Sequence, residues 1–182
     1  MHHPILTQFT QDEYLRREES RTEKSELHHG FAVAFAGGTI LHDQLASRVR
    51  TILASLFPEP CLVFGSDVKV KVSADMFLYP DVGVICEPVD FASVYVELPR
   101  IVVEVLSPST RGYDVIEKRA AYRSLPSLEA YLIVHYDIRR IEVDVRGFGG
   151  TWRTMLYHEP DDVLLGDRGT PVAEFYGPFV AP

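Results

Sequence analysis

The sequence predicts an α/β (α+β) domain in which a mixed central sheet is flanked by helices, with extra strands towards the C-terminus. Three observations support this class. Apolar residues recur at helical spacing over residues 41–56, and they alternate with polar residues over 68–72 and 141–145. The run at 101–106 is apolar except at Glu104, as expected for a central strand that is buried on both faces.

The first half of the chain is expected to begin with a helix and a hairpin. Thr10 and Glu13 have the spacing of a capping box, which marks the start of a helix. Gly30 separates two short apolar segments and supplies the turn between them, and Pro58 ends the long helical pattern. The elements expected here are a helix over about 10–17, a hairpin of 25–27 and 31–35, and a helix over 41–56.

The second half is richer in strands. Lys69 and Lys71 alternate with three valines, which is typical of a strand with one exposed face. The glycines between 147 and 150 indicate a turn. The elements expected here are strands over 68–72, 77–86 and 101–106, a helix from about 113 to 125, and strands over 131–134, 141–145 and 152–157. The order α-ββ-α-βββ-α-β-β-β predicts one mixed sheet with helices packed on it.

The composition fits one globular domain over residues 1–182, because 46% hydrophobic and 24% charged residues exclude disordered and fibrous classes. No apolar run approaches the ~20 residues of a membrane helix, and the first residues do not resemble a secretory signal. We therefore expect a cytoplasmic protein with no membrane partner. Cys61 and Cys86 lack CxxC spacing, and we expect them to be free buried thiols.

The net charge of −8 counts against broad, nonspecific coating of a nucleic-acid duplex, which requires a basic surface. The charge is uneven, however. Over residues 100–123 five basic residues accompany three acidic ones, so this part of the chain could hold a phosphate.

Glu104 and Asp81 are the most informative acidic residues. A carboxylate inside an apolar strand is costly to bury unless it meets a cation, a proton or water. Asp81 follows Pro80 on the preceding predicted strand, so the two carboxylates can converge. Two such carboxylates repel each other unless a divalent cation or a shared proton lies between them, and Mg2+ or Mn2+ is the natural oxygen-ligated occupant.

Asp114, Lys118 and Tyr122 are spaced by four residues and form one stripe of the predicted helix. One interpretation is an ordinary surface ion pair between Asp114 and Lys118, with a packed tyrosine beside it. The other is that Lys118, lying near Asp81 and Glu104, polarises a water molecule or neutralises a phosphoryl oxygen.

Several short motifs accompany these residues. They are Glu26-x-x-x-Gly30, Ala36-Gly37-Gly38-Thr39 with His42, Tyr79-Pro80-Asp81-Val82, Val-Val-Glu-Val-Leu-Ser-Pro-Ser-Thr at 102–110, Asp114-x-x-x-Lys118-x-x-x-Tyr122, and Ser-Leu-x-x-Tyr at 127–131. Together they resemble the bacterial "putative restriction endonuclease" family of the PD-(D/E)XK, or restriction-endonuclease-like, superfamily. The resemblance covers about residues 10–160 and implies an αβββαβ core with extra strands.

The resemblance also implies roles for individual residues. Asp81 and Glu104 correspond to metal ligands, together with the carbonyl of Val105, and Glu26 is a further acidic site residue that could serve a second metal. Lys118 stands in for the motif lysine. The possible neighbours of the site are His42, Asp114 and Tyr122.

The chain departs from the family pattern at two places. Leu106 occupies the strand position where many superfamily members have lysine, so the lysine is displaced to the helix at Lys118. His29 and Phe31 flank Gly30, where related sequences carry an acid or amide before the glycine and an acid after it.

The function predicted from these residues is a metal-dependent nuclease that hydrolyses phosphodiester bonds in DNA, with Mg2+ or Mn2+ as cofactor. We expect a homodimer, in which Trp152 and the aromatic residues of 157–179 offer apolar surface beyond the needs of the core. The alternative is a non-catalytic nucleic-acid-binding or assembly module that retains the fold, and a weaker one is glycoside hydrolysis by the carboxylate pair.

Overall fold

The strands form two main sheets in the computed structural model, which describes residues 7–34, 38–106, 112 and 114–179. The five-stranded sheet has the order β2 (Phe31–Ala34), β1 (Ser25–His28), β5 (Met76–Leu78), β4 (Lys69–Ser73), β7 (Tyr95–Val96). The six-stranded sheet has the order β11 (Trp152–His158), β10 (Arg140–Arg146), β9 (Ala130–Val134), β8 (Ile101–Val105), β6 (Val82–Ile85), β3 (Leu62–Gly65). Each sheet combines one parallel pair with antiparallel pairs. The predicted α+β class with mixed sheets flanked by helices is confirmed.

The expectation of a single sheet is wrong, and the reason lies in the segment 77–86, which was expected to be one strand. The segment is divided between β5 in one sheet and β6 in the other. Pro80 lies between them, and because proline has no backbone N–H it cannot continue the hydrogen-bond ladder of a central strand. Asp81 therefore lies at the junction of the two sheets.

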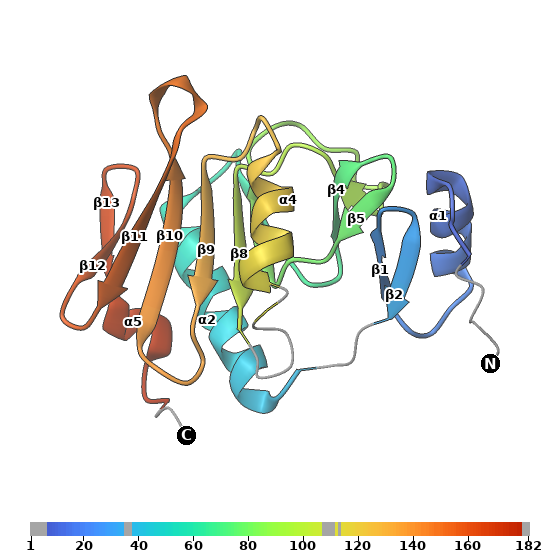
Figure 1. The fold of residues 1–182 in the computed structure, drawn as a ribbon. Helices are drawn as coiled ribbons and strands as arrows, with labels where there is room; N and C mark the ends of the chain where they lie inside the picture. The colour runs from blue at the N-terminus through green and yellow to red at the C-terminus, as the bar shows by residue number, and fades with distance from the viewer. Residues whose placement is uncertain (1–6, 35–37, 107–111, 113, 180–182) are drawn as a thin grey trace.

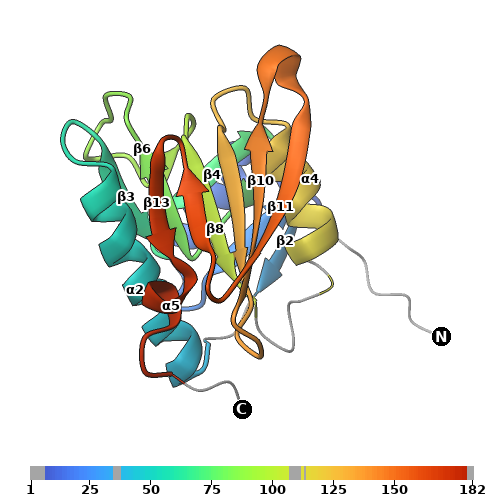
Figure 2. The same cartoon turned by 90° about the vertical axis from the view of Figure 1, so that its left-hand side faces the viewer.

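The helices pack against the sheets. Figures 1 and 2 show α2 (Ile40–Leu56) on one face of the six-stranded sheet and α4 (Arg119–Arg123) on the other. A π-helix, η1 (Asp114–Lys118), leads directly into α4, so the helix expected from about 113 to 125 is not uniformly α-helical. On the five-stranded sheet, α1 (Gln11–Glu19) begins with the predicted capping box and buries Tyr14 against Leu27 and Phe77.

The core follows the predicted hydrophobic patterns. The apolar stripe of α2 buries Leu45, Val49 and Leu53 against one face of the six-stranded sheet. Val102 and Val103 are both fully buried, on opposite faces of β8, which confirms the prediction of a strand buried on both sides. Glu104, the next residue of β8, is buried as well.

The C-terminal part of the chain holds elements that were not expected. These are a hairpin of β12 (Asp162–Leu165) and β13 (Arg168–Pro171), and a short helix, α5 (Val172–Tyr176). Phe175 and Tyr176 are buried against α2, so they do not supply the free apolar surface that was expected for a dimer interface.

The expectation of free thiols is also wrong. Cys61 and Cys86 form a disulfide. The reason is the pairing of β3 with β6, in which Leu62 lies opposite Ile85 and thus brings the two flanking cysteines together.

Among the described residues, no helix combines the length and apolar character that crossing a bilayer requires. The motif residues Ala36, Gly37 and Ser107–Thr110 lie outside the described residues, as does Tyr113 at the expected start of the helix.

Candidate active site

Lys118 lies at the centre of a buried acidic cluster. Its ammonium Nζ is 2.9 Å from Glu26 Oε1 and 3.2 Å from Glu104 Oε1. Lys118 and Glu26 are each 7% exposed, and Glu104 is 3% exposed. The interpretation of Lys118 as an exposed surface partner of Asp114 is therefore wrong. The side chain of Asp114 itself lies outside the described part of the chain.

Three distant elements bring this cluster together. Glu26 lies on β1 of the five-stranded sheet, Glu104 lies on β8 of the six-stranded sheet, and Lys118 is the last residue of η1. Single π-helical turns are rare and occur frequently at functional sites. Tyr122, one turn further along α4, donates its hydroxyl to Glu104 Oε1 at 3.3 Å. The predicted stripe of Lys118 and Tyr122 thus faces the carboxylate of Glu104.

The backbone of Tyr79 bridges the same groups. Its N–H donates to Glu26 Oε1 at 2.8 Å, and its carbonyl accepts from Lys118 Nζ at 3.5 Å. The ammonium of Lys118 therefore distributes its donors among two carboxylates and one carbonyl. This arrangement fixes the position of the ammonium at the boundary between the two sheets.

Glu26 is held in its charged form. Burial alone raises the pKa of its carboxyl, but the hydrogen bond from His28, the charge of Lys118 and the Tyr79 N–H outweigh burial and hold the pKa below its ordinary value. His28 Nε2 is 3.0 Å from Glu26 Oε2. The cluster thus contains a carboxylate that stays ionised at neutral pH.

Asp81 lies beside Glu104 at the end of two paired strands. Val82 pairs with Val103 in antiparallel register, and Asp81 directly precedes Val82, next to the end of β8 that carries Glu104. Its Oδ2 accepts the Val105 N–H at 2.7 Å and lies 3.2 Å from His42 Nε2. His42, in the first turn of α2, therefore contacts Asp81, one of the candidate metal ligands.

The donor set suits a divalent cation with oxygen ligands. Asp81, Glu104 and the Val105 carbonyl offer hard oxygen donors, and Glu26 adds a third carboxylate beside the ammonium of Lys118. Within the ranges that the structure describes, no group of three or more His, Cys, Asp or Glu side chains forms a ready metal site. A cation here would also need backbone, water or phosphate oxygens, which is how Mg2+ is usually bound in phosphoryl-transfer sites.

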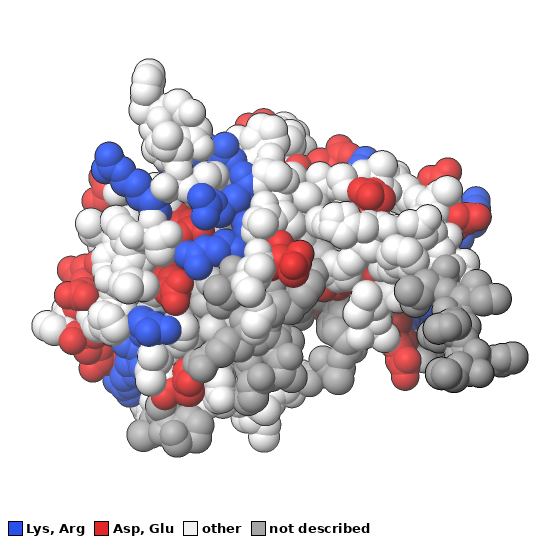
Figure 3. All heavy atoms as spheres, in the orientation of Figure 1, with Lys and Arg blue, Asp and Glu red and all other residues white. Residues whose placement is uncertain are grey.

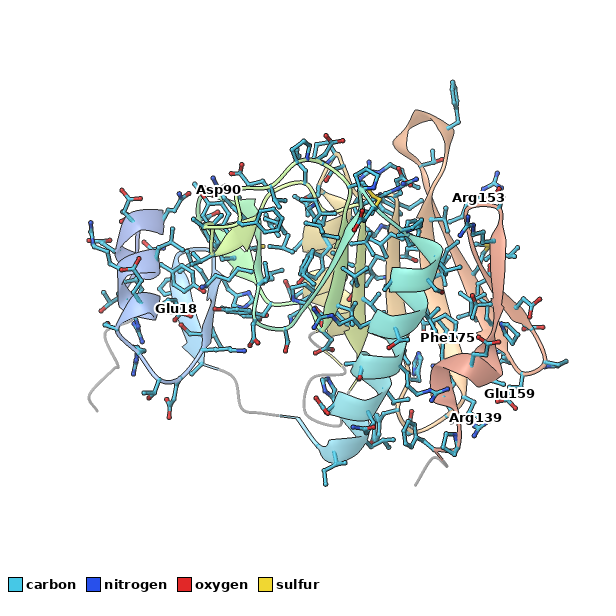
Figure 4. All side chains as sticks on the ribbon, turned by 180° about the vertical axis from the view of Figure 1, so that it is seen from behind. Glu18, Asp90, Arg139, Arg153, Glu159 and Phe175 are labelled. Carbon is cyan, nitrogen blue, oxygen red and sulfur yellow. A yellow bond between two sulfur atoms is a disulfide. The ribbon has the colours of Figure 1, made fainter. Side chains whose placement is uncertain are left out.

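An open cleft of about 650 Å3 reaches Asp81 from the surface. It lies between α2, β3 and the segment 89–96, and its charged lining includes Asp43, Asp67 and Asp90 (Asp90 is labelled in Figure 4) together with Arg50. An acidic cleft disfavours the approach of a phosphate unless a cation is present. The acidic lining of the cleft therefore agrees with a cation bound by the oxygen donors at Asp81.

Two contributors to the cluster were missed by sequence reasoning. His28 follows Glu26 by two residues on a strand, so the period of two placed both side chains on one face. That spacing was the available signal. The bridging peptide groups of Tyr79 had no such signal, because they depend on how β5 meets the helix η1.

The fold is restriction-endonuclease-like. A crystal structure from Anabaena variabilis, described as "a putative nuclease belonging to DUF820", aligns with a TM-score of 0.73 over 92% of this chain and 97% of that chain. The two sequences are 17% identical, so this likeness concerns the fold.

The family is shown by sequence. The model of the Uma2 family, "Putative restriction endonuclease", matches residues 11–175, and the chain belongs to this family. Two uncharacterized proteins of Synechocystis sp. are similar to it. The protein slr1290 is 34% identical over 165 residues, covering 89% of this chain and 87% of the relative. The protein sll1609 is 34% identical over 138 residues, covering 73% of this chain and 78% of the relative.

Proposed function

We propose that this protein is a divalent-metal-dependent nuclease that hydrolyses phosphodiester bonds in DNA. The observation that carries the proposal is the buried ammonium of Lys118, held by Glu26 and Glu104 at the sheet junction where Asp81 binds the Val105 N–H. A fixed ammonium beside buried carboxylates suits a reaction in which negative charge develops on a phosphoryl group. The membership of the Uma2 family supports the same reaction class.

Asp81, Glu104 and the Val105 carbonyl are the residues that would hold Mg2+ or Mn2+. When bound, such a cation supplies Lewis-acid chemistry, because it polarises a phosphoryl oxygen and lowers the pKa of a coordinated water molecule. The hydrogen bonds that Asp81 makes with Val105 and His42 fix the orientation of its carboxylate before any ligand arrives.

Lys118 acts on the substrate side of the site. Its ammonium orients the attacking water and offsets charge on the pentacovalent transition state, and burial strengthens both effects because the local dielectric is low. Glu26 acts chiefly by holding Lys118 in place, and Tyr122 steadies Glu104 by its hydroxyl.

Cleavage of a supercoiled plasmid and of a single-stranded oligonucleotide tests the proposal. The parent protein should cleave in Mn2+ and not in EDTA, and Glu104→Gln should lose cleavage. A matched control is Glu97→Gln, which alters a largely exposed glutamate that pairs with Lys71 on the surface. If the parent cleaves no nucleic acid with Mg2+ or Mn2+, the nuclease proposal is wrong and the non-catalytic binding or assembly module replaces it.

We further propose that the protein works as a homodimer in the cytoplasm. A pair of active sites related by two-fold symmetry would cut both strands of a duplex. The Cys61–Cys86 disulfide counts against this location, because disulfides are rare in cytosolic proteins. Fractionation of the native host with a specific antibody tests the location.

A further inference from the structure

The hairpin between β10 and β11 rises beyond the rest of the six-stranded sheet (Figures 1 and 2). Its turn is Phe148–Gly150, and Phe148 is fully exposed. Gly149 and Gly150 both have positive φ angles of 72° and 78°, which favour glycine, so the tight turn leaves the phenyl ring as the principal side chain at the tip. An exposed aromatic ring at this place contributes nothing to the core of its own chain.

Arginines surround the base of this hairpin. Trp152, the first residue of β11, pairs with Arg146, the last residue of β10. The guanidinium of Arg146 lies 4.6 Å from the Trp152 ring centroid, and that of Arg123 lies 5.1 Å from it. The view in Figure 3 shows Lys and Arg side chains gathered over α4 and the neighbouring strands.

The acidic groups near these arginines are few and already engaged. Asp144 is fully buried and accepts two hydrogen bonds of 2.6 Å from Arg119, which also donates to Glu142 at 3.3 Å. Arg123 is 3.6 Å from the same carboxylate and keeps 33% of its side chain exposed. Arg146 donates hydrogen bonds from Nε and Nη2 to backbone carbonyls, including that of Leu128. A positive surface remains on a protein whose net charge is −8.

This basic surface is connected with the candidate active site. Arg119 directly follows Lys118 in sequence, and Arg123 lies one turn further along α4. The helix therefore extends from the buried ammonium to the base of the hairpin. A strand that follows the helix could contact both places.

We propose that the β10–β11 hairpin and Arg123 form the surface that holds the nucleic-acid strand, with Phe148 stacked on a base and with Arg123 and Arg146 on the phosphates. The inference rests on the proposed nuclease function and names how its substrate is held. Arginine suits phosphate, and an exposed aromatic ring stacks on any base without sequence preference. An apolar partner alone would not explain the arginines beside the exposed ring.

Binding without cleavage tests this surface. Fluorescence anisotropy in EDTA would measure the Kd of the intact protein for labelled single-stranded and duplex oligonucleotides of DNA and RNA. Phe148→Ala should raise the Kd roughly 5- to 150-fold, because stacking on one base contributes that much. A 2-aminopurine base in the oligonucleotide should report the loss of stacking.

Arg123→Gln should weaken binding and reduce the slope of log Kd against log salt by about 0.7–0.9, which corresponds to one lost phosphate contact. Two matched controls accompany these variants. Arg153→Gln removes an exposed arginine on the opposite face of β11 (Arg153 is labelled in Figure 4), and Leu164→Ala removes an exposed apolar side chain on β12. Neither control should change the Kd more than two-fold.

The outcomes separate this inference from the proposed function. If the parent cleaves and binds nucleic acid while Phe148→Ala and Arg123→Gln bind as the parent does, the hairpin surface is wrong and the nuclease stands. If the parent neither binds nor cleaves, both fail. If Phe148→Ala instead abolishes self-association in sedimentation and leaves the Kd unchanged, the hairpin contacts a second copy and the inference is overturned.

Discussion

Replacing Lys118 by methionine is the most discriminating perturbation of the candidate site. Methionine approximately keeps the length of the side chain but removes the ammonium that lies 2.9 Å from Glu26 Oε1 and 3.2 Å from Glu104 Oε1. The two carboxylates, both buried, then lose the ammonium that contacts both of them. An exposed helical pair would lose only ~0.5 kcal/mol by the same change.

The magnitude follows from the burial. At an effective dielectric constant of about 20, each contact at this distance is worth about 5 kcal/mol of attraction, most of which desolvation offsets. Removing one partner of a buried ion pair costs about 3–5 kcal/mol of unfolding free energy, because the remaining charge stays buried. The double variant Glu26→Gln with Lys118→Met should lose less than the sum of the single variants, because one of the stranded charges is also removed.

The sign of the pH dependence is fixed by Glu26. Its pKa in the folded protein lies below the ordinary value of 4.5, so its stabilisation is complete above that value and is lost as pH falls through the folded pKa. Without Lys118 the folded pKa of Glu26 rises. The difference in stability between the parent and Lys118→Met should therefore shrink as the pH is lowered from 7 towards 4.

Urea unfolding followed by circular dichroism measures these free energies. The control is Lys71→Met, which should lose ~1 kcal/mol or less because Lys71 pairs with the largely exposed Glu97. In the cleavage assay Lys118→Met should be slower by roughly 100-fold or more. Lys118→Arg should not restore the rate, because a planar guanidinium cannot replace a compact ammonium. A loss below ~1 kcal/mol with undiminished cleavage would refute the reasoning.

Three further predictions follow from the structure. Mn2+ at 100 times its Kd should stabilise the folded parent protein by about 2.7 kcal/mol. Asp81→Asn should remove most of this stabilisation, and the control Asp67→Asn should keep it. A melting temperature that does not change with Mn2+ would contradict the metal site. Asp144→Asn should cost about 3–5 kcal/mol at pH 7, because it breaks the buried pair with Arg119. Burial raises the pKa of the Asp144 carboxyl, but hydrogen bonds from Arg119 and Thr154 outweigh burial and hold the pKa below 3.8. The cost of Asp144→Asn should therefore diminish as pH falls below about 4. A cost that does not change with pH in urea titrations would count against this prediction. Light scattering should give a particle of twice 20.6 kDa, and a 20.6 kDa particle would exclude the homodimer.

The sequence by itself determined the elements whose signals are local. The capping box at Thr10, the turn at Gly30 and the apolar stripe of α2 all report contacts within a few residues, and each is present in the structure. The resemblance to the family was carried by short motifs, and it brought Asp81, Glu104 and Lys118 together as candidates. The structure places all three at the junction of the sheets.

Only the tertiary structure decided which surfaces meet. Periodicity shows that a face is buried but not what covers it, so the burial of Phe175 against α2 had no local signal. Pro80 marks the point at which 77–86 divides, but only the tertiary structure decided which sheet each half joins. The same holds for the pairing of Glu26 with Lys118, two residues far apart in sequence. Their ion pair exists because β5 and β6 diverge at Pro80 and allow β1 and η1 to meet beside β8. The strength of that pair comes from its burial, which is a property of the assembled sheets.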